Sequence, residues 1–517
     1  MTHISPTGVL GVDDLLSDIT AADGTTVTVL APFTAQPLVE LPQSSATDVA
    51  DAAAAARVAQ AAWFAAGPAH RRAVLLRGHD LLLERRERVL DFNQLETGKS
   101  RAQAFEELVQ AGNSARYAAL TAPRLLRSRA RRGVLPVVTR ASVDYVPKGL
   151  IGVITPWNFP VSLAAMDVLP ALAAGNAVIQ KSDNQATLSV LSVRRAFIDA
   201  GVPAALWAVV AGPGDVVGNA LVDASDYVCF TGSTPTGIRV AGRAASALHG
   251  ASLELGGKNP MIVLDDADVA KAAQGAAYGS FSALGQLCVS MERIYVERGI
   301  EKEFSTAFVD AVTSLSQGPE LDFDVDLGSL TSAAQLERVE AHVADAVAKG
   351  ATVLTGGRAR PDLGPYFYEP TVLTGVTSEM ACFADETFGP LVSIHVVDSE
   401  DAAIDQANAS QFGLNASVYS RSLTRARRVA RRLQAGTVNL NEPYRAAFGS
   451  VDAPMGGMKK SGLGRRNGPE GILRFTDTRT IGEATVLFQL PTTGSGMKKL
   501  VPVVMLLLRV MRALRLR

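Results

Sequence analysis

The feature that most constrains the fold is an alternation of short apolar runs with helix-forming runs that begins at Gly149. Apolar strands that alternate with helices form a parallel sheet with helices on both faces. We therefore expect an α/β fold of the doubly wound class, whose ligands bind beyond the carboxyl ends of the strands. The predicted strands are 149–155, 175–181, 207–212 and 226–231.

A second alternating region runs from Asn259 to Asn441 and predicts a second α/β domain. We find no repeat of solenoid length and no long low-complexity linker in the chain. The predicted helices of this region are 268–284, 300–315, 332–349, 401–409 and 423–434.

The N-terminal part of the chain is predicted to be a hairpin followed by helices. Residues 23–42 alternate in short β-prone pieces, and residues 46–121 carry apolar residues at three- and four-residue spacing. We expect Thr47 to cap the first helix. Trp63 and the pair Leu75 and Leu76 are expected in the core, because large apolar side chains are usually buried.

Residues 124–147 interrupt the helical pattern. Six arginines fall between Pro123 and Ala141, and alternating apolar residues follow. This pattern favours a protruding strand pair that a partner subunit covers, because an open strand edge invites aggregation. The alternative is an ordinary surface hairpin with a solvated basic turn.

The overall charge gives no support to nucleic-acid binding, and the number of cysteines argues against a disulfide-stabilised secreted protein. The formal net charge is −1, so no global field favours nucleic acid. Three cysteines in 517 residues argue against a disulfide framework and indicate a reducing compartment. They lack metal-ligand spacing, so we predict no metal site. The N-terminus does not resemble a secretory signal, and we expect a cytoplasmic protein.

Two reactive residue types stand in glycine-rich surroundings. Glu254 opens the run ELGGK, and Cys288 follows 34 positions later in GQLC. A cysteine attacks carbonyl groups as the thiolate, which needs an electropositive or base-assisted setting. A carboxylate that activates water completes a two-stage covalent mechanism. We therefore hypothesise that Cys288 forms a covalent intermediate and that Glu254 helps to break it.

Two further motifs follow apolar strands directly. In TPWNFP (155–160) two prolines hold Trp157 and Asn158 rigidly, and the Asn158 amide can stabilise an oxyanion. An amide that serves only its own loop is an equal alternative. In FTGSTPTG (230–237) free N–H groups at a helix start suit a pyrophosphate, although a plain capped helix explains the pattern equally well.

Two weaker candidates lie at other strand ends. Lys181 begins KSDN (181–184) and can hold a ribose or phosphate. Glu386 in ETFGP (386–390) can accept ribose hydroxyls, with Phe388 near a flat ring. For each charged residue taken alone, a solvated surface side chain is the simpler explanation.

Taken together, these motifs stand in a fixed order, and in that order the chain resembles the aldehyde dehydrogenase superfamily. The resemblance extends from about Thr25 to Ile481 and includes the late stretch 454–462. Within the superfamily, residues 285–297, 367–373 and 453–471 are most similar to proteins assigned as NADP-dependent succinate-semialdehyde dehydrogenases. The six ordered motifs are TPWNFP, KSDN, FTGSTPTG, ELGGKNP, GQLC and ETFGP.

The resemblance implies a role for each candidate residue. Cys288 would be the nucleophile, Asn158 an oxyanion donor and Glu254 the base that hydrolyses the thioester, which favours hydrolysis over transfer to coenzyme A. The cofactor would be NADP, with NAD as an alternative. The residues that would bind it are Trp157, Asn158, Lys181, Ser182, Asp183, Asn184, Gly232, Ser233, Leu255, Glu386 and Phe388.

The resemblance also implies a domain organisation and a homodimer or homotetramer. Residues 1–124 and 148–256 would form the cofactor-binding domain, and residues 257–476 the catalytic domain. Residues 125–147 and 477–496 would form a β oligomerisation arm.

Two departures from the family pattern bear on cofactor and substrate. NAD-preferring relatives commonly carry a Glu where this chain has Asn184, so a 2′-phosphate meets less repulsion and we expect NADP to be preferred. Met166 and Ser282 stand where succinate-semialdehyde enzymes place arginines, and Arg445 is a possible substitute. Succinate semialdehyde is the first candidate substrate; the alternative is a broad range of aliphatic, long-chain or aromatic aldehydes.

Residues 497–517 lie beyond the usual family core. The apolar run 501–508 is too short to span a bilayer, but Arg509, Arg512 and Arg515 recur every three residues and can form one face of an amphipathic helix. We weigh a peripheral membrane contact against a tail docked on protein.

Two other classes remain as alternatives. A non-catalytic family member is disfavoured because Cys288, Glu254 and Asn158 are all present. A cysteine hydrolase needs a histidine base, and His249, the nearest in sequence, has no supporting motif.

Overall fold

The computed structural model describes residues 12–133, 139–484 and 491–515. The predicted cofactor domain, arm and tail each include a few residues outside these ranges. The chain divides into two compact units, Met1–Leu125 with Pro147–Thr476 and Leu126–Val146 with Asp477–Arg517.

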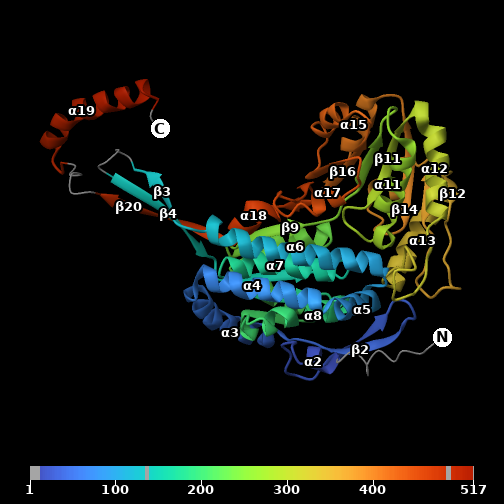
Figure 1. The fold of residues 1–517 in the computed structure, drawn as a ribbon, viewed down its shortest axis with the longest axis horizontal. Coiled ribbons are helices and arrows are strands. Elements are labelled where there is room, and N and C mark those ends of the chain that lie inside the picture. Colours follow the sequence, from blue (N-terminus) through green and yellow to red (C-terminus); the bar gives the residue numbers. More distant parts are fainter. Residues whose placement is uncertain (1–11, 134–138, 485–490, 516–517) are drawn as a thin grey trace. The chain divides into compact units, whose positions relative to one another are not determined.

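The first unit begins with a short helix, a hairpin and four long helices (Figure 1). The expected hairpin forms from antiparallel strands β1 and β2. Trp63 and Leu75 are buried, while Leu76 is only half-buried. The elements are α2 (Val12–Leu16), β1 (Thr26–Ala31), β2 (Gln36–Pro42), α3 (Ala46–Ala65), α4 (Gly67–Glu84), α5 (Arg86–Thr97) and α6 (Arg101–Leu125).

The prediction that Thr47 caps α3 is wrong. The cap is Ser45, whose hydroxyl accepts a hydrogen bond from the Asp48 N–H at 3.1 Å. The Asp48 carboxylate in turn accepts from the Ser45 N–H at 2.8 Å. This reciprocal capping box satisfies two helix donors that a cap at Thr47 would leave open.

A six-stranded sheet carries the first set of motifs. Its order is β19-β9-β8-β5-β6-β7, and every neighbouring pair from β9 to β7 is parallel. The doubly wound α/β expectation is confirmed. Its strands are β5 (Leu150–Thr155), β6 (Ala177–Ser182), β7 (Trp207–Val210), β8 (Tyr227–Thr231), β9 (Gly250–Glu254) and β19 (Gly462–Leu463). Its helices are α7 (Pro160–Ala173), α8 (Thr187–Asp199), α9 (Asn219–Ala224) and α10 (Thr234–Ser246).

A seven-stranded sheet of order β12-β13-β14-β11-β10-β16-β17 forms the second α/β region. Only the pairing of β12 with β13 is antiparallel. The strands are β10 (Asn259–Val263), β11 (Met291–Glu297), β12 (Thr352–Thr355), β13 (Thr371–Thr374), β14 (Leu391–Val397), β16 (Asn415–Tyr419) and β17 (Thr437–Leu440). The helices are α11 (Val269–Phe281), α12 (Glu301–Thr313), α13 (Ala333–Ala348), α14 (Ala381–Ala384), α15 (Glu400–Asn408), α16 (Leu423–Ala430) and α17 (Arg445–Phe448). Helix α18 (Gly468–Leu473) packs instead against α6 and α7. A two-stranded ladder joins β15 (Phe412–Gly413) to β18 (Met458–Lys459).

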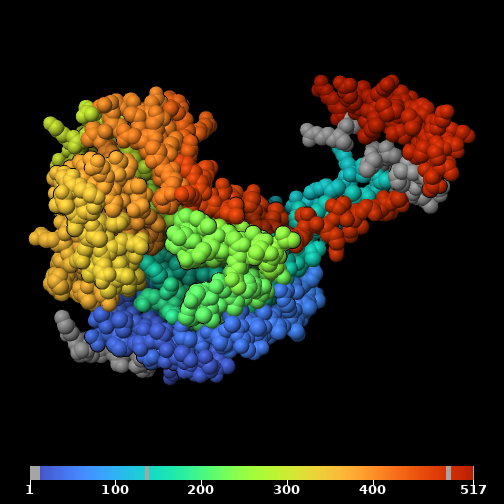
Figure 2. Space-filling view, turned by 180° about the vertical axis from the view of Figure 1, so that it is seen from behind, coloured from blue at the N-terminus to red at the C-terminus, as the bar shows by residue number. Residues whose placement is uncertain are grey.

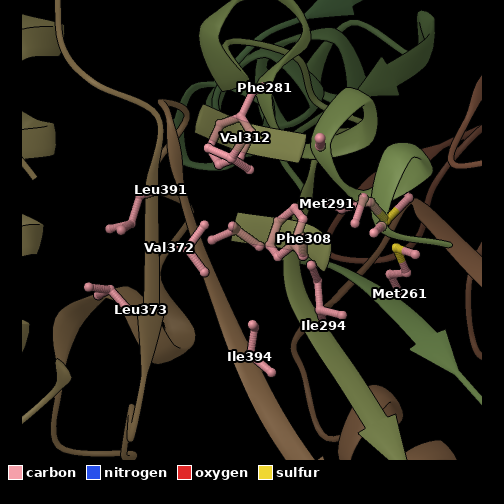
Figure 3. Packing of buried hydrophobic residues seen from close by; sticks show 14 of the residues in the cluster. Met261, Phe281, Met291, Ile294, Phe308, Val312, Val372, Leu373, Leu391 and Ile394 are labelled. Atoms are coloured by element: carbon pink, nitrogen blue, oxygen red, sulfur yellow. The ribbon is translucent and has the colours of Figure 1, made fainter. Parts of the chain in front are cut away.

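A large apolar core lies between this second sheet and its helices. Figure 3 shows Phe281 of α11 and Phe308 of α12 with side chains from the strands, including Ile294 and Val372. These four side chains are all completely buried. In the space-filling view, the segments of this region form the yellow and orange surface of the first unit (Figure 2). The core therefore provides a rigid support for the loops at the strand ends.

The second unit contains a small antiparallel sheet and a long helix. The sheet has the order β20-β4-β3, and the helix is α19 (Gly494–Ala513). Among its described residues no side chain is buried. The strands are β3 (Arg129–Arg132), β4 (Thr139–Pro147) and β20 (Thr476–Ala484).

Candidate active site

The structure brings Cys288, Glu254 and Asn158 to the wall of one cavity of about 230 Å³. Glu254 ends β9 and Asn158 follows β5, and both strands end at the same edge of the parallel sheet. Three groups with complementary chemistry therefore face the same space. The cavity is also lined by Trp157, Phe159, Leu163, Gly232, Ser233, Leu255, Leu287, Arg338, Glu386, Phe388, Phe448, Met455 and Arg466.

A strained turn places Cys288 in this cavity. The predicted helix 268–284 ends early, at Phe281, because Ala283 and Leu284 adopt left-handed φ angles of 48° and 54°. Gly285 follows with φ of 72°, and a Cβ on it would lie 2.1 Å from the Gly389 carbonyl oxygen. Left-handed backbone is costly for residues other than glycine, and it persists where the surroundings impose it. The turn thus fixes the direction of the chain just before the thiol.

Asn259 holds the backbone of Cys288 from the other side. Its Nδ2 donates to the carbonyl oxygens of Cys288 at 2.8 Å and Ser290 at 2.7 Å. Gly257 allows this approach, since a Cβ there would lie 2.7 Å from the Cys288 carbonyl oxygen. Sequence reasoning assigned no role to Asn259, although it stands in the ELGGKNP motif.

The amide of Asn158 keeps one N–H available for a ligand. Its Nδ2 donates to the Gln286 carbonyl at 3.0 Å, and an amide nitrogen carries two hydrogens. The remaining hydrogen belongs to a side chain that lines the cavity. This is the arrangement expected of an oxyanion donor.

A buried ion pair below Asn158 was not predicted. Lys99 and Glu107 form a salt bridge, and Lys99 Nζ also donates to the Asn158 carbonyl at 2.6 Å. Glu107 accepts the N–H groups of Val161 at 2.9 Å and Ser162 at 3.1 Å, in the first turn of α7. The pair therefore ties the Asn158 loop to the helix after it. Lys and Glu are rarely buried, and no local sequence pattern indicates that Lys99 and Glu107 pair, so the sequence did not predict this contact.

Burial raises the pKa of Glu254 to about 7. The largest opposing influence is the guanidinium of Arg466, which also lines the cavity. Arg466 is held by Asp167 at 2.5 Å and 2.9 Å and donates to the Thr231 hydroxyl at 2.8 Å. Arg474 pairs with the same Asp167. A carboxylate with a pKa near neutrality is suited to proton transfer.

Burial, followed by the nearby charges of Glu254 and Glu386, raises the pKa of the Cys288 thiol to about 12. Cys288 is therefore a neutral thiol at physiological pH in the structure as it stands. It becomes a nucleophile only when a base accepts its proton.

A second cavity of about 740 Å³ lies beyond the ends of β5, β6 and β8. Ser233 precedes α10 without capping its backbone, so first-turn N–H groups stay open to an anion. Thr236 and the exposed Arg239, which sequence reasoning missed, line the same space.

The KSDN motif contributes three of its four residues to this second cavity, namely Lys181, Asp183 and Asn184. Burial lowers the pKa of Lys181, whose Nζ donates to the Ser182 carbonyl at 3.3 Å. Ser182 is not brought to the cavity. It is completely buried, and its hydroxyl shares a 2.8 Å hydrogen bond with that of Thr187. The Asn184 amide donates to Gln43 Oε1 at 3.1 Å.

Glu386, Phe388 and Trp157 meet at the first cavity. Glu386 Oε1 accepts the Gly257 N–H at 2.8 Å, and burial raises the pKa of its carboxyl to about 8. The Trp157 and Phe388 rings lie edge to face with centroids 5.7 Å apart. The two aromatic rings can pack against a flat ring of a ligand, and the Glu386 carboxyl group can bind the hydroxyls of a ribose.

The two cavities fit a nicotinamide dinucleotide. They share a wall of Pro156, Trp157, Thr231, Gly232 and Ser233, so one track connects the open helix start with the thiol. A cation and a helix N-terminus can bind the phosphates of a dinucleotide. A carboxyl group can accept hydrogen bonds from its ribose, and aromatic faces can pack against its base. The fold and site thus define a thiol-dependent oxidoreductase that uses a dinucleotide.

The comparisons with known proteins identify the family. The model of the "Aldehyde dehydrogenase family" matches residues 19–481, and the chain belongs to that family. It is an NAD(P)-dependent aldehyde dehydrogenase, and the resemblance seen in the sequence is confirmed.

Curated relatives and solved structures agree. A Mycobacterium tuberculosis protein named "Putative succinate-semialdehyde dehydrogenase (NADP(+)) 2" is 49% identical, with 93% of each chain covered. A betaine aldehyde dehydrogenase of Cereibacter sphaeroides is 37% identical over 89% of this chain and 94% of its own. An NAD-dependent aldehyde dehydrogenase from Sinorhizobium meliloti superposes with a TM-score of 0.88 at 34% identity, covering 92% and 94%.

One side of Cys288 is apolar. The half-buried Tyr278 and Phe448 pack with Cys288 against a buried cluster, and no histidine is among the residues that line the cavity. The cysteine hydrolase alternative therefore lacks its base. The cluster consists of Phe159, Leu163, Met166, Ala283, Leu287, Val289, Leu414, Tyr444 and Met455.

Arg445 is not a free anchor for a carboxylate. It donates to Glu106 Oε1 at 2.5 Å, and its guanidinium lies 3.5 Å from the Tyr278 ring centroid. Arg338 and Arg466 line the cavity, but Arg466 is already paired with Asp167 and is therefore not a free partner for a substrate carboxylate. The exposed Arg338 stands on α13 beside Gln335, which donates to the Phe388 carbonyl at 2.9 Å.

Proposed function

We propose that Cys288, Glu254 and Asn158 oxidise an aldehyde to a carboxylic acid through a thiohemiacetal and a thioester on Cys288. The observation that supports this is their convergence on one cavity, next to the dinucleotide track. Water, and not coenzyme A, releases the product, because Glu254 stands in the cavity with a pKa near neutrality.

The side chains divide the reaction into two stages. Glu254 in its ionised form, in the same cavity, takes the proton of the Cys288 thiol as the sulfur adds to the aldehyde carbon, and it releases that proton to solvent before the second stage. The oxyanion receives hydrogen bonds from the free Asn158 N–H and the Cys288 backbone N–H. A bound NAD(P) supplies the hydride acceptor. Glu254 then takes a proton from water, the hydroxide attacks the thioester, and the acid leaves with Cys288 regenerated.

Glu254→Gln tests the second stage. We expect the variant to form the acyl-enzyme with a burst of reduced cofactor and then to turn over at least about a hundredfold more slowly, since general-base catalysis is worth roughly that much. Hydrolysis at the wild-type rate would contradict the assignment. Glu442→Gln, outside the cavity lining, is the matched control.

We infer a preference for NADP over NAD. Asn184 in the second cavity adds no charge against a 2′-phosphate. Lys181 and Arg239 supply cations in the same space, beside the carboxylates of Asp183 and Asp215. We expect Asn184→Glu to shift the ratio of kcat/KM for NADP and NAD toward NAD by at least about tenfold. A wild-type enzyme that strongly prefers NAD would overturn this inference.

Two observations bear on the aldehyde. Succinate semialdehyde is favoured by the name of the relatives that are 49% identical. An uncharged aliphatic or aromatic aldehyde is favoured by the apolar cluster beside Cys288. The apolar cluster predicts a higher kcat/KM for hexanal than for succinate semialdehyde, because a carboxylate set against this cluster would be buried without a partner. The opposite order would establish succinate semialdehyde.

We also propose that the enzyme works in the cytoplasm as a homodimer or homotetramer. The three cysteines, all free thiols in the structure, support a reducing compartment. The predicted arm (125–147 and 477–496) is the proposed oligomer contact, and the tail (497–517) adds a peripheral membrane contact.

A further inference from the structure

Helix α19 (Gly494–Ala513) exposes an unusual amount of apolar surface. None of its residues is buried, and Val503, Leu506 and the following Leu514 are 62%, 64% and 64% exposed. Single exposed apolar residues are ordinary, but a contiguous set marks a contact surface. The other exposed large apolar residues are Met497, Val501, Met505, Leu507, Leu508 and Val510.

The charges around this helix have one sign only. No Asp or Glu occurs after Glu483, whereas the described residues 491–515 contain five cations. None of the five is buried. They are Lys498, Lys499, Arg509, Arg512 and Arg515.

Helical geometry separates the two kinds of side chain. At about 100° per residue, Lys498, Arg509 and Arg512 fall within a sector of roughly 60°. Leu507 and Leu514, seven positions apart, lie on the opposite face. Lys499 and Arg515 lie about 100° to either side of Lys498, and Met505 falls inside the cationic sector. The helix therefore gathers its cations around Lys498 and presents a mainly apolar face, centred on Leu507, on the opposite side.

We propose that α19 lies along an anionic lipid surface, with its apolar face in the acyl region and its cations at the phosphates. Helices of this kind bind in the plane of the headgroups. Among the described residues, no helix is long and apolar enough to cross a membrane. An in-plane contact is the arrangement that satisfies both faces.

A second copy of α19 is a poorer partner. Paired amphipathic helices use opposite charges beside the apolar seam to set their partner. Two copies of α19 would bring only cations together, because the helix has no acidic residue. An anionic surface provides the missing charge.

Co-sedimentation of the full-length enzyme with vesicles tests the proposal. We expect binding to vesicles of phosphatidylglycerol with phosphatidylcholine and much weaker binding to phosphatidylcholine alone. Arg509→Gln with Arg512→Gln should lower the partition coefficient roughly thirtyfold, since each cation contributes about a factor of five at an anionic surface. Leu507→Gln should lower it as well.

Matched controls lie on α16 (Leu423–Ala430). Arg427→Gln removes an exposed arginine and Leu423→Gln an apolar residue that is 47% exposed. Both should bind vesicles like the wild type. Equal binding to both vesicle types, or no loss in the α19 variants, would overturn the proposal.

Two readouts separate other outcomes. If the α19 variants change the mass by light scattering while the wild type ignores vesicles, a second copy is the occupant and the lipid proposal fails. Aldehyde oxidation in vesicle-free solution should be the same for all variants, so a failure of the proposed catalytic function shows there and not in the vesicle assay.

Discussion

At the scale of single residues, the charge on Glu254 depends on burial and on Arg466, which act in opposite directions. Arg466 is itself fixed by Asp167 and Thr231. Asp167 and Arg466 are 299 positions apart, and no motif links them. The sequence therefore predicted Glu254 as a base but not the ion pair beside it.

Arg466→Met should raise the pKa of Glu254 further, because the variant removes the largest opposing charge and leaves Asp167 less neutralised. A carboxyl group acts as a base only when it is ionised, so the proposed role of Glu254 predicts that the rising acid limb of kcat moves to higher pH. Arg466→Lys keeps the charge and should move it less. The measurement is kcat against pH under conditions where thioester hydrolysis limits the rate. An acid limb at the same pH in the wild type and in both variants would contradict this explanation of the Glu254 pKa.

At the scale of elements, the apolar runs predicted the strands well, because a buried parallel strand needs continuous apolar sequence. Element ends were harder to predict. Ser45 and Thr47 can both cap α3, and only Asp48 three positions after Ser45 decides between them. Helix α11 ends early, at Phe281, because Ala283 and Leu284 adopt left-handed φ angles. Alanine and leucine rarely adopt this conformation, so their identity does not predict the end of the helix.

The turn before Cys288 gives a test at this scale. Gly285→Ala should lower kcat severely and lower Tm, because the new methyl group would meet the Gly389 carbonyl oxygen at 2.1 Å and the φ angle is positive. Gly299→Ala, where a Cβ meets nothing within 4 Å, should leave both unchanged. Steady-state kinetics and thermal denaturation of the two variants decide; similar behaviour would show that the turn does not depend on glycine.

At the scale of the whole molecule, the second unit lacks a core of its own, since none of its described side chains is buried. An isolated small sheet with open edges is marginally stable. The strand pair of the arm was predicted from a break in the helical pattern, because alternating apolar residues follow the arginines there. Its contact with a second subunit stays a prediction.

We therefore expect the order of this unit to depend on oligomer formation. On dilution below the dissociation constant, limited proteolysis should cut within the described residues 126–133, 139–146, 477–484 and 491–515 before it cuts the first unit. At high concentration these segments should be protected. Equal cleavage rates at both concentrations, read by mass spectrometry with the oligomer followed by ultracentrifugation, would count against the arm as an oligomer contact.

The high thiol pKa of Cys288 has a consequence for survival of the enzyme between turnovers. Peroxides and alkylating agents attack the thiolate, which is scarce when the pKa is about 12. A sluggish reaction with such reagents is therefore compatible with full catalytic competence. Burial of the sulfur, with the neighbouring Glu254 and Glu386, therefore protects Cys288 from oxidation by keeping it protonated.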